Sequence, residues 1–168
     1  MSRWGITRSV AVVAVLMGTL TGVSAAAQEE TEGPGNRALI DADATSAAID
    51  AATSLSEDLF SFSYTDLKAH EAKFGRLTTG DFSGQYADVF ATFIAEATSQ
   101  QVTLTSTVAE SAVQVLQDGH AVVLVFLDQE TTSGVTGQKT EGSAMYRATI
   151  DRVDGDWKFA DIDLYEGK

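Results

Sequence analysis

The sequence predicts an α+β domain in which three N-terminal helices pack on a strongly curved, four-stranded antiparallel sheet. Residues 44–99 carry apolar side chains at helical spacing, whereas residues 102–165 alternate in short apolar runs. Two Asp-Gly pairs, at 118–119 and 154–155, lie between β-rich runs and indicate tight hairpins. Because the helices precede the strands instead of alternating with them, we expect the helices on one face of the sheet, enclosing a cone that could hold a pocket.

The chain opens with an apolar segment, residues 1–27, which predicts a signal anchor or a signal peptide. Arg3 and Arg8 precede an uncharged run over residues 9–27, a pattern typical of export signals. The run is close to the length that spans a bilayer, while Ala25 and Ala27 fit a cleavage site. We therefore expect either a single-pass cell-membrane protein with its C-terminal domain outside, or a secreted protein cleaved near Ala27.

Residues 28–43 predict a flexible acidic tether, and residues 44–168 the folded domain. The tether, "QEETEGPGNRALIDAD", holds the single proline of the chain and a cluster of acids. The first helix should start at a cap near Asp43, and a shorter second helix should run from a cap at Thr65 to a stop at Gly75. The inner faces of these helices are predicted to be Ala48, Ala52, Leu55, Leu59 and Phe62, then Leu67, His70 and Phe74.

The stretch "GRLTTGDFSGQY", residues 75–86, predicts the start of the third helix. Thr78 and Asp81 have the spacing of a capping box, in which a hydroxyl and a carboxylate satisfy free backbone N–H groups. A phosphate-binding loop would need a lysine that this stretch lacks. The apolar face that follows is Phe82, Tyr86, Val89, Phe90, Phe93, Ile94 and Ala97.

Four strands are expected after Ser99. They fall in "VTLTSTVAESAVQVL", "HAVVLVFLDQ", "AMYRATIDRV" and "DWKFADIDLY", with a polar loop over residues 130–142. Trp157 is predicted to be a core residue of the last strand.

The charge and the lack of cysteine exclude several classes of function. The chain has 24 Asp and Glu against 11 Lys and Arg, a formal net charge of -13. Such a surface repels a phosphate backbone, so nucleic acid is not an expected partner. With no cysteine, disulfides and thiolate-based nucleophiles or metal sites are excluded.

The order of helices and strands, with the ending "DGDWKFADIDL", resembles the nuclear transport factor two-like (SnoaL-like) superfamily of cone-shaped domains. Those domains commonly close with a pattern matched here by Asp154, Gly155, Trp157 and Phe159. Within the superfamily, "SYTDL", "LTTGDFSGQY", "AVVLVFLDQ" and "YRATIDRVDGDWKFADIDL" look like the Mce-associated membrane proteins, over about residues 44–165. The resemblance implies a non-enzymatic accessory or stabilising protein of a bacterial envelope complex. Its expected partners are components of an Mce (mammalian cell entry) type lipid-import transporter.

The same superfamily contains ketosteroid isomerases and cyclases, so an enzyme is the first alternative and a lipid- or small-ligand-binding module the second. Such enzymes need a carboxylate base facing a hydrogen-bond donor in an apolar pocket. The candidate donors are Tyr64, Tyr86 and Tyr146, and the candidate bases are Asp81, Asp128 and Asp161. No spacing pairs them, and we predict no catalytic residues. Residues expected to line a pocket, if one is open, are Tyr64, Tyr86, Tyr146 and Trp157.

The histidines and the acidic clusters predict no metal or cofactor. His70 lies on an apolar helix face and His120 at a strand start, too far apart in sequence for a ligand motif. "DADAT" and "DRVDGDW" depart from a calcium loop, because Ser46 and Val153 stand where glycine and an acid are needed.

Overall fold

The computed structural model describes residues 35–164, so the expectations for residues 1–34 and 165–168 lie outside the described residues. The helices are α2 (Ala42–Phe60), α3 (Leu67–Glu71), α4 (Phe74–Leu77) and α5 (Gly80–Ser99). The strands are β1 (Phe62–Ser63), β2 (Val102–Gln117), β3 (His120–Ser133), β4 (Lys139–Val153) and β5 (Asp156–Leu164). Within residues 35–164, no helix is long and apolar enough to cross a bilayer.

The strands form one antiparallel sheet in the order β1-β2-β3-β4-β5. It has five strands, so the prediction of four was wrong. The missed strand is β1, where Phe62 pairs with Leu104. The helical spacing of Phe62 from Leu59 suggested a longer helix, but the backbone turns extended at Ser61. Irregular pairing at two points in β2 and one between β4 and β5 marks bulges, which increase the curl of a sheet.

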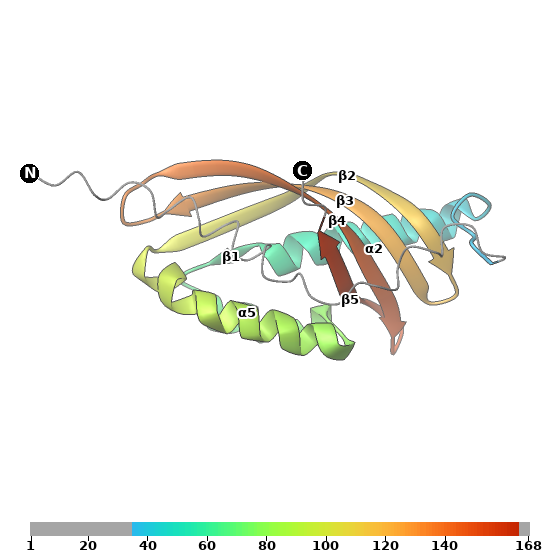
Figure 1. The fold of residues 1–168 in the computed structure, drawn as a ribbon, viewed down its shortest axis with the longest axis horizontal. Helices are drawn as coiled ribbons and strands as arrows, with labels where there is room; N and C mark the ends of the chain where they lie inside the picture. Colours follow the sequence, from blue (N-terminus) through green and yellow to red (C-terminus); the bar gives the residue numbers. More distant parts are fainter. Residues whose placement is uncertain (1–34, 165–168) are drawn as a thin grey trace, which may run out of the picture.

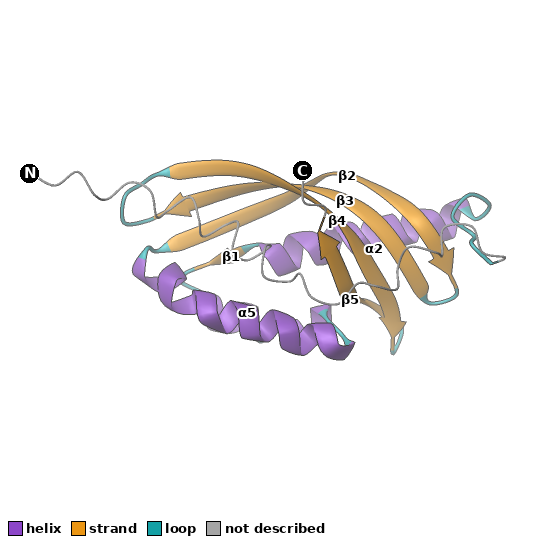
Figure 2. Cartoon of the chain, viewed as in Figure 1, coloured by secondary structure: helices purple, strands orange, loops and turns teal. Residues whose placement is uncertain are grey.

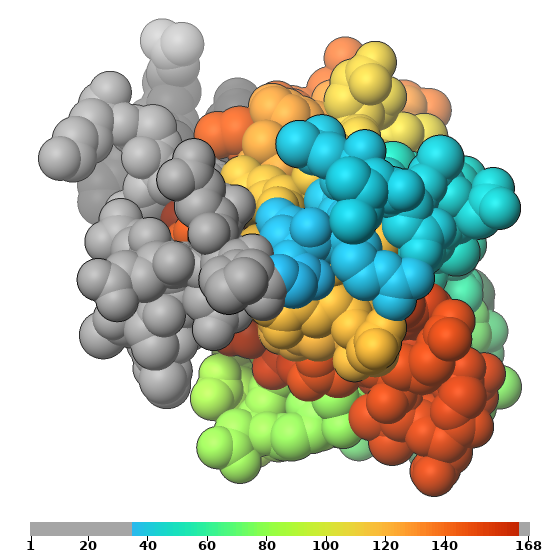
Figure 3. Space-filling view, turned by 90° about the vertical axis from the view of Figure 1, so that its right-hand side faces the viewer, coloured from blue at the N-terminus to red at the C-terminus, as the bar shows by residue number. Residues whose placement is uncertain are grey.

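The sheet arches over the two long helices (Figure 1). Figure 2 shows all helices on the concave side of the sheet, as the sequence predicted. Helix α2 packs on β2 and β3, whereas α5 packs on β2 and β5. At one end, the first described residues lie against β2 (Figure 3), where the Arg37 N–H donates to the carbonyl of Leu116. This contact fixes where the chain enters the domain.

Large aromatic side chains fill the space between the helices and the sheet. Tyr86, Tyr146 and Phe159 are fully buried, and Phe60 is 2% exposed. The ring of Phe60 lies between 5.7 and 6.3 Å from the rings of the other three. Packed aromatic side chains around Phe60 therefore fill the centre of the cone that the sequence predicted.

Two predicted helix boundaries differ from the structure. The cap of α2 is Asp41, not Asp43: the Asp41 carboxylate accepts from the Ala44 N–H at 3.0 Å, and Arg37 forms an ion pair with it. The second predicted helix is broken into α3 and α4. The cap of α3 is Asp66 instead of Thr65, and Gly75 lies inside α4 instead of ending a helix.

The start of α5 was predicted at the correct place with the wrong cap. Thr79 is its N-cap and makes no side-chain cap hydrogen bond. The Thr78 hydroxyl instead donates to the carbonyl of Phe74 at 2.6 Å and lies 2.6 Å from the Ser83 hydroxyl. Asp81 is exposed in the first helical turn, where a negative charge is favourable. The capping box is therefore absent, and Thr78 closes α4.

Both Asp-Gly hairpins are confirmed, joining β2 to β3 and β4 to β5. Asp154 and Gly155 both have positive φ, at 55° and 95°, as a tight hairpin turn requires. The polar loop is shorter than predicted, because polar residues at 130–133 and 139–142 continue strands β3 and β4. Trp157 is only partly buried, at the rim of the core; Phe159 is the fully buried aromatic of β5.

Candidate functional site

The interior contains a short hydrogen-bonded network at the end of α2. The Tyr86 hydroxyl donates to the carbonyl of Leu59, and the Ser106 hydroxyl donates to the carbonyl of Phe60, both at 2.6 Å. Gln129 in turn donates from its side-chain amide to the Ser106 hydroxyl at 3.0 Å. All three side chains are buried; Tyr86 and Ser106 bind the last carbonyls of the helix, which lack partners within the helix itself.

The four residues expected to line a pocket lie at different depths. Burial raises the pKa of both Tyr86 and Tyr146 well above the ordinary tyrosine value. The Tyr146 hydroxyl makes no hydrogen bond that meets the usual distance and angle limits. The nearby Ser56 hydroxyl nevertheless interacts with it and partly offsets the rise in the pKa of Tyr146. Tyr64 and Trp157 are both partly exposed, and the Arg152 guanidinium lies 5.0 Å from the centre of the Trp157 ring. Their role in lining a pocket stays a prediction.

The candidate carboxylates lie away from the buried tyrosines. Asp128 pairs with Ser143, and Asp161 with Thr149, so both side chains leave the sheet on the face opposite to Tyr146. Asp81 is exposed on α5. Among the buried polar residues of segment 35–164 there is no Asp or Glu. None of the three candidate carboxylates therefore lies beside the buried Tyr86 or Tyr146.

The two histidines lie in different surroundings. His70 is 4% exposed, and its ring lies between 5.0 and 5.8 Å from the rings of Phe62, Phe74 and Phe90. Burial, followed by the nearby Lys73 charge, lowers the pKa of His70 to about 4. His120 lies on β3, with Nδ1 2.7 Å from an oxygen of Asp151. The described residues contain no group of three or more side chains that could hold a metal ion.

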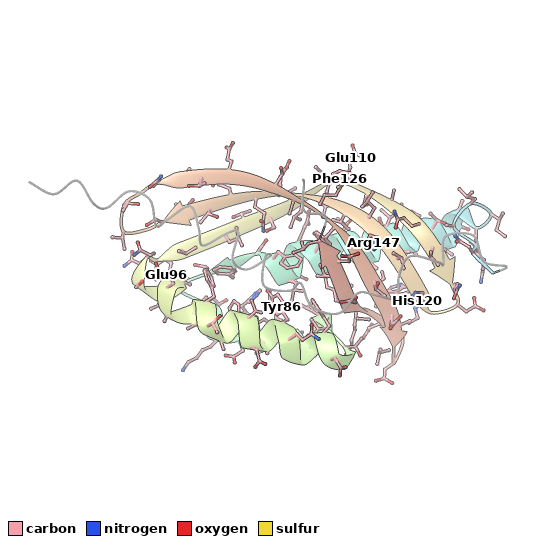
Figure 4. The ribbon with its side chains drawn as sticks, viewed as in Figure 1. Tyr86, Glu96, Glu110, His120, Phe126 and Arg147 are labelled. Carbon is pink, nitrogen blue, oxygen red and sulfur yellow. The ribbon has the colours of Figure 1, made fainter. Side chains whose placement is uncertain are left out.

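The outer, convex face of the sheet carries the most exposed aromatic side chain of residues 35–164. Side chains of Val122, Leu124 and Phe126 point outward from β3, and Phe126 is 41% exposed. Its cross-strand neighbours are Glu110 on β2 and Met145 on β4. Figure 4 shows Glu110 and Phe126 above the sheet and Tyr86 beneath it. This face is the candidate interaction site.

An open hollow of about 580 Å³ lies on this face, and its lining includes Asp128, the next outward residue after Phe126 on β3. Six of its lining residues have outward side chains: Thr105, Thr107, Asp128, Glu130, Glu141 and Ser143. Lys139 lies beside it, with its ammonium 2.8 Å from a Glu130 oxygen. The hollow is therefore lined by hydroxyls and carboxylates, which suits a cationic side chain.

The sequence carried a signal for this site that the strand prediction did not use. A strand with one buried face alternates, but "AVVLVFL" is apolar without a break. Such a run indicates a strand covered on both faces. Among the described residues, helices cover only the inner face of β3, so the outer members of the run are left as a surface of this part of the chain.

No protein-family model matches the chain. It is 33% identical over 118 residues to the uncharacterized protein Rv1362c of Mycobacterium tuberculosis H37Rv, a match that covers 70% of this chain. The matching protein of strain CDC 1551 gives the same values. The chain spans about half the length of these curated relatives, since the match covers 54% of each.

Solved structures of low sequence identity share the fold. An IcmL-like type IV secretion system protein from Legionella pneumophila is 6% identical, with a TM-score of 0.64, covering 73% of this chain and 93% of its own. CagV, a VirB8 homolog of the Helicobacter pylori type IV secretion system, is 12% identical, with a TM-score of 0.60 and coverages of 73% and 99%.

A nuclear transport factor 2-like superfamily protein from Salmonella enterica is 13% identical, with a TM-score of 0.53 and coverages of 74% and 94%. These likenesses define the class of protein by its fold. The chain has the nuclear transport factor two-like fold, which VirB8-like proteins share.

Proposed function

We propose that this chain is a non-enzymatic accessory protein that stabilises a bacterial envelope complex. The observation that carries the proposal is the contrast between the two faces of the sheet. The concave face is closed by packed aromatics around Phe60, whereas the convex face presents Phe126 beside an acid-lined hollow. An exposed aromatic within a polar rim is the usual composition of a protein-binding surface.

The complex that we propose is an Mce-type lipid-import transporter. Support comes from the motifs between residues 44 and 165 that resemble Mce-associated membrane proteins. The fold neighbours CagV and the IcmL-like protein are named as type IV secretion system proteins. By analogy of fold, a domain of this shape suits attachment to a larger envelope assembly.

We propose that residues 1–27 place the domain outside the cell membrane, as an anchor or as a cleaved signal. The apolar run and its flanking arginines support both outcomes. The mass of the intact protein recovered from membranes distinguishes them. A soluble product that begins near Gln28 would contradict the anchor.

The experiment that tests the function is affinity purification of the full chain from detergent-solubilised membranes of its native host, followed by mass spectrometry. We expect Mce-type transporter subunits to be recovered with the chain and to be less abundant in membranes of a deletion strain. Recovery of a different envelope complex would keep the accessory role and remove the Mce assignment. If no envelope protein is enriched over an untagged control, the accessory role is wrong.

The alternative functions are a SnoaL-like cyclase or isomerase and a lipid- or small-ligand-binding module. One observation favours them: the Tyr146 hydroxyl is buried without a regular hydrogen-bond partner in the middle of the core. A ligand that opened the core could use this donor. Against the enzyme, Asp128 and Asp161 would have to cross the sheet to reach it.

A further inference from the structure

The outer face of the sheet combines an apolar ridge with the acidic hollow. The outer ridge consists of Leu124, Phe126 and Met145, and the acidic hollow of the six outward side chains given above. We propose that this face binds a basic, amphipathic protein segment: an apolar side chain covers the outer ridge and Lys or Arg side chains enter the acidic hollow. The proposal rests on the accessory role and names the chemistry of the partner.

The outer ridge is apolar surface that the described residues leave open. Phe126 is 41% exposed, while Val125 and Leu127 on either side of it are fully buried on the inner face. Met145 lies directly across from Phe126 on β4. Covering a large aromatic and its neighbours would remove apolar area from water at roughly 25 cal/mol per Å², so this ridge is a natural anchor point.

The acidic hollow keeps like charges together at a cost in stability. Glu130 and Glu141 lie directly opposite each other on β3 and β4, an arrangement that destabilises a sheet. Asp128 lies two residues from Glu130 on the same face. Lys139 pairs with Glu130 and offsets part of this repulsion, whereas Asp128 and Glu141 form no ion pair among the described residues. A cationic partner would relieve this repulsion.

The spacing along β3 sets the pattern of the partner. Phe126, Asp128 and Glu130 share one face at successive alternate positions, about 7 Å apart at the rise of a β-strand. An extended segment lying along β3 would meet them with alternate side chains. We therefore expect an apolar residue with Lys or Arg at the two adjacent alternate positions on one side of it, after it in a segment parallel to β3 and before it in an antiparallel one.

Charge complementarity decides against the other occupants. A symmetric dimer through this face would bring the carboxylates of Asp128, Glu130 and Glu141 of both copies together. An anionic lipid surface would be repelled in the same way. The net charge of -13 adds to both effects. A basic protein segment is the occupant that the face attracts.

The first experiment measures peptide binding to the purified full chain by fluorescence anisotropy. The probe is a synthetic peptide of alternating Leu and Lys, and the matched probe replaces each Lys by Gln. We expect the double variant Asp128→Asn/Glu141→Gln, and separately Phe126→Ser, to weaken binding of the Lys probe about threefold to thirtyfold. The control Asp88→Asn/Glu96→Gln makes the same charge change on exposed α5 and should alter binding less than about twofold.

Three results of this experiment would overturn the proposal. If the α5 control variant lost as much affinity for the Lys probe, the binding would be a general attraction between a basic peptide and an acidic protein. Equal binding of the Gln probe would remove the role of the carboxylates. Self-association of the chain that Phe126→Ser abolishes would make the face a contact between two copies.

The second experiment separates this proposal from the accessory role. A photo-reactive phenylalanine analogue replaces Phe126 in the full chain in native cells, and Thr92 on α5 in the control. We expect position 126 to capture a segment rich in Lys or Arg from an envelope protein. Capture from position 92 alone, or of lipid at 126, would overturn the docking face and leave the accessory role standing. If neither position captures an envelope protein, the docking face is wrong, and the affinity purification described above decides the accessory role.

Discussion

The Tyr86 hydroxyl donates a hydrogen bond to the carbonyl of Leu59 at 2.6 Å, across the interface between α5 and the end of α2. Leu59 is one residue from the end of α2, where helix carbonyls have no partner in the helix. Tyr86 is fully buried, so no solvent replaces the bond. Tyr86, which the sequence made a candidate catalytic donor, therefore stabilises the packing of α5 against the end of α2.

Tyr86→Phe should lower the free energy of unfolding by about 1–2 kcal/mol, because it leaves the Leu59 carbonyl buried without that donor. Urea denaturation monitored by circular dichroism measures the change, and the slope with urea should stay constant. Tyr64→Phe is the control: Tyr64 is partly exposed, and its loss should cost less than about 0.5 kcal/mol. Equal effects of the two changes would contradict the assignment.

His70 should make the domain sensitive to mild acid. The pKa of His70 is lowered to about 4 in the folded chain, from 6.5 when unfolded, chiefly by burial and then by Lys73. Between these values the unfolded chain binds a proton that the folded chain does not. The contribution of His70 is therefore fully present above pH 6.5 and is lost as the pH falls through the folded value, with a slope of at most about 1.4 kcal/mol per pH unit.

Denaturation measured at a series of pH values between about 7 and 4 tests this dependence. His70→Phe, which matches the surrounding rings, should flatten the slope in that interval. His120→Gln changes the half-exposed histidine on β3 and should leave the contribution of His70 in place. A slope that His70→Phe does not alter would assign the acid sensitivity to other groups.

The fold could be predicted where the sequence pattern is long and regular. Helices α2 and α5 have 19 and 20 residues, and each buries one apolar stripe along its length. The Asp-Gly turns need residues that accept a positive φ, which the sequence shows directly. Strand β1 has two residues, which is too short to show alternation. The choice of Asp41 over Asp43 as a cap depends on Arg37, which pairs with Asp41 and whose N–H donates to the carbonyl of Leu116, a residue far away in the sequence.

The candidate site was harder to predict for a different reason. Tyr86 and Tyr146 have the right chemistry for catalysis, and only the sheet register shows that Asp128 and Asp161 leave on the other face. The outer ridge depends on which of two apolar faces of β3 the helices cover. Tertiary packing decides which face the helices cover, and the sequence "AVVLVFL" does not show it because both of its faces are apolar.

Asp41→Ala should destabilise the domain more than Asp81→Ala. Asp41 accepts from the Ala44 N–H and pairs with Arg37, and these two contacts lower the pKa of its carboxyl. Asp81 makes no cap hydrogen bond. We expect the thermal midpoint to fall by about 2–6 °C for Asp41→Ala and by about 1 °C or less for Asp81→Ala, measured by calorimetry. The reverse order would restore Asp81 as the main cap.

The purified full chain should show no turnover of steroid enones or polyketide esters above background. A general base held beside a tyrosine donor in an apolar pocket is worth about 10²–10⁴-fold in rate, so its presence would be plain in a working assay. Here Asp128 faces outward opposite Ser143, whereas Tyr146 is buried on the inner face of the same strand pair. An active isomerase of the same fold is the positive control for the assay.

Turnover that Asp128→Asn or Asp161→Asn abolishes, with circular dichroism and thermal midpoint intact, would require the outer face to be catalytic and would overturn the accessory role. Turnover that survives both changes but disappears in Tyr146→Phe would instead require the core to open around Tyr146, because its hydroxyl is fully buried in the closed domain.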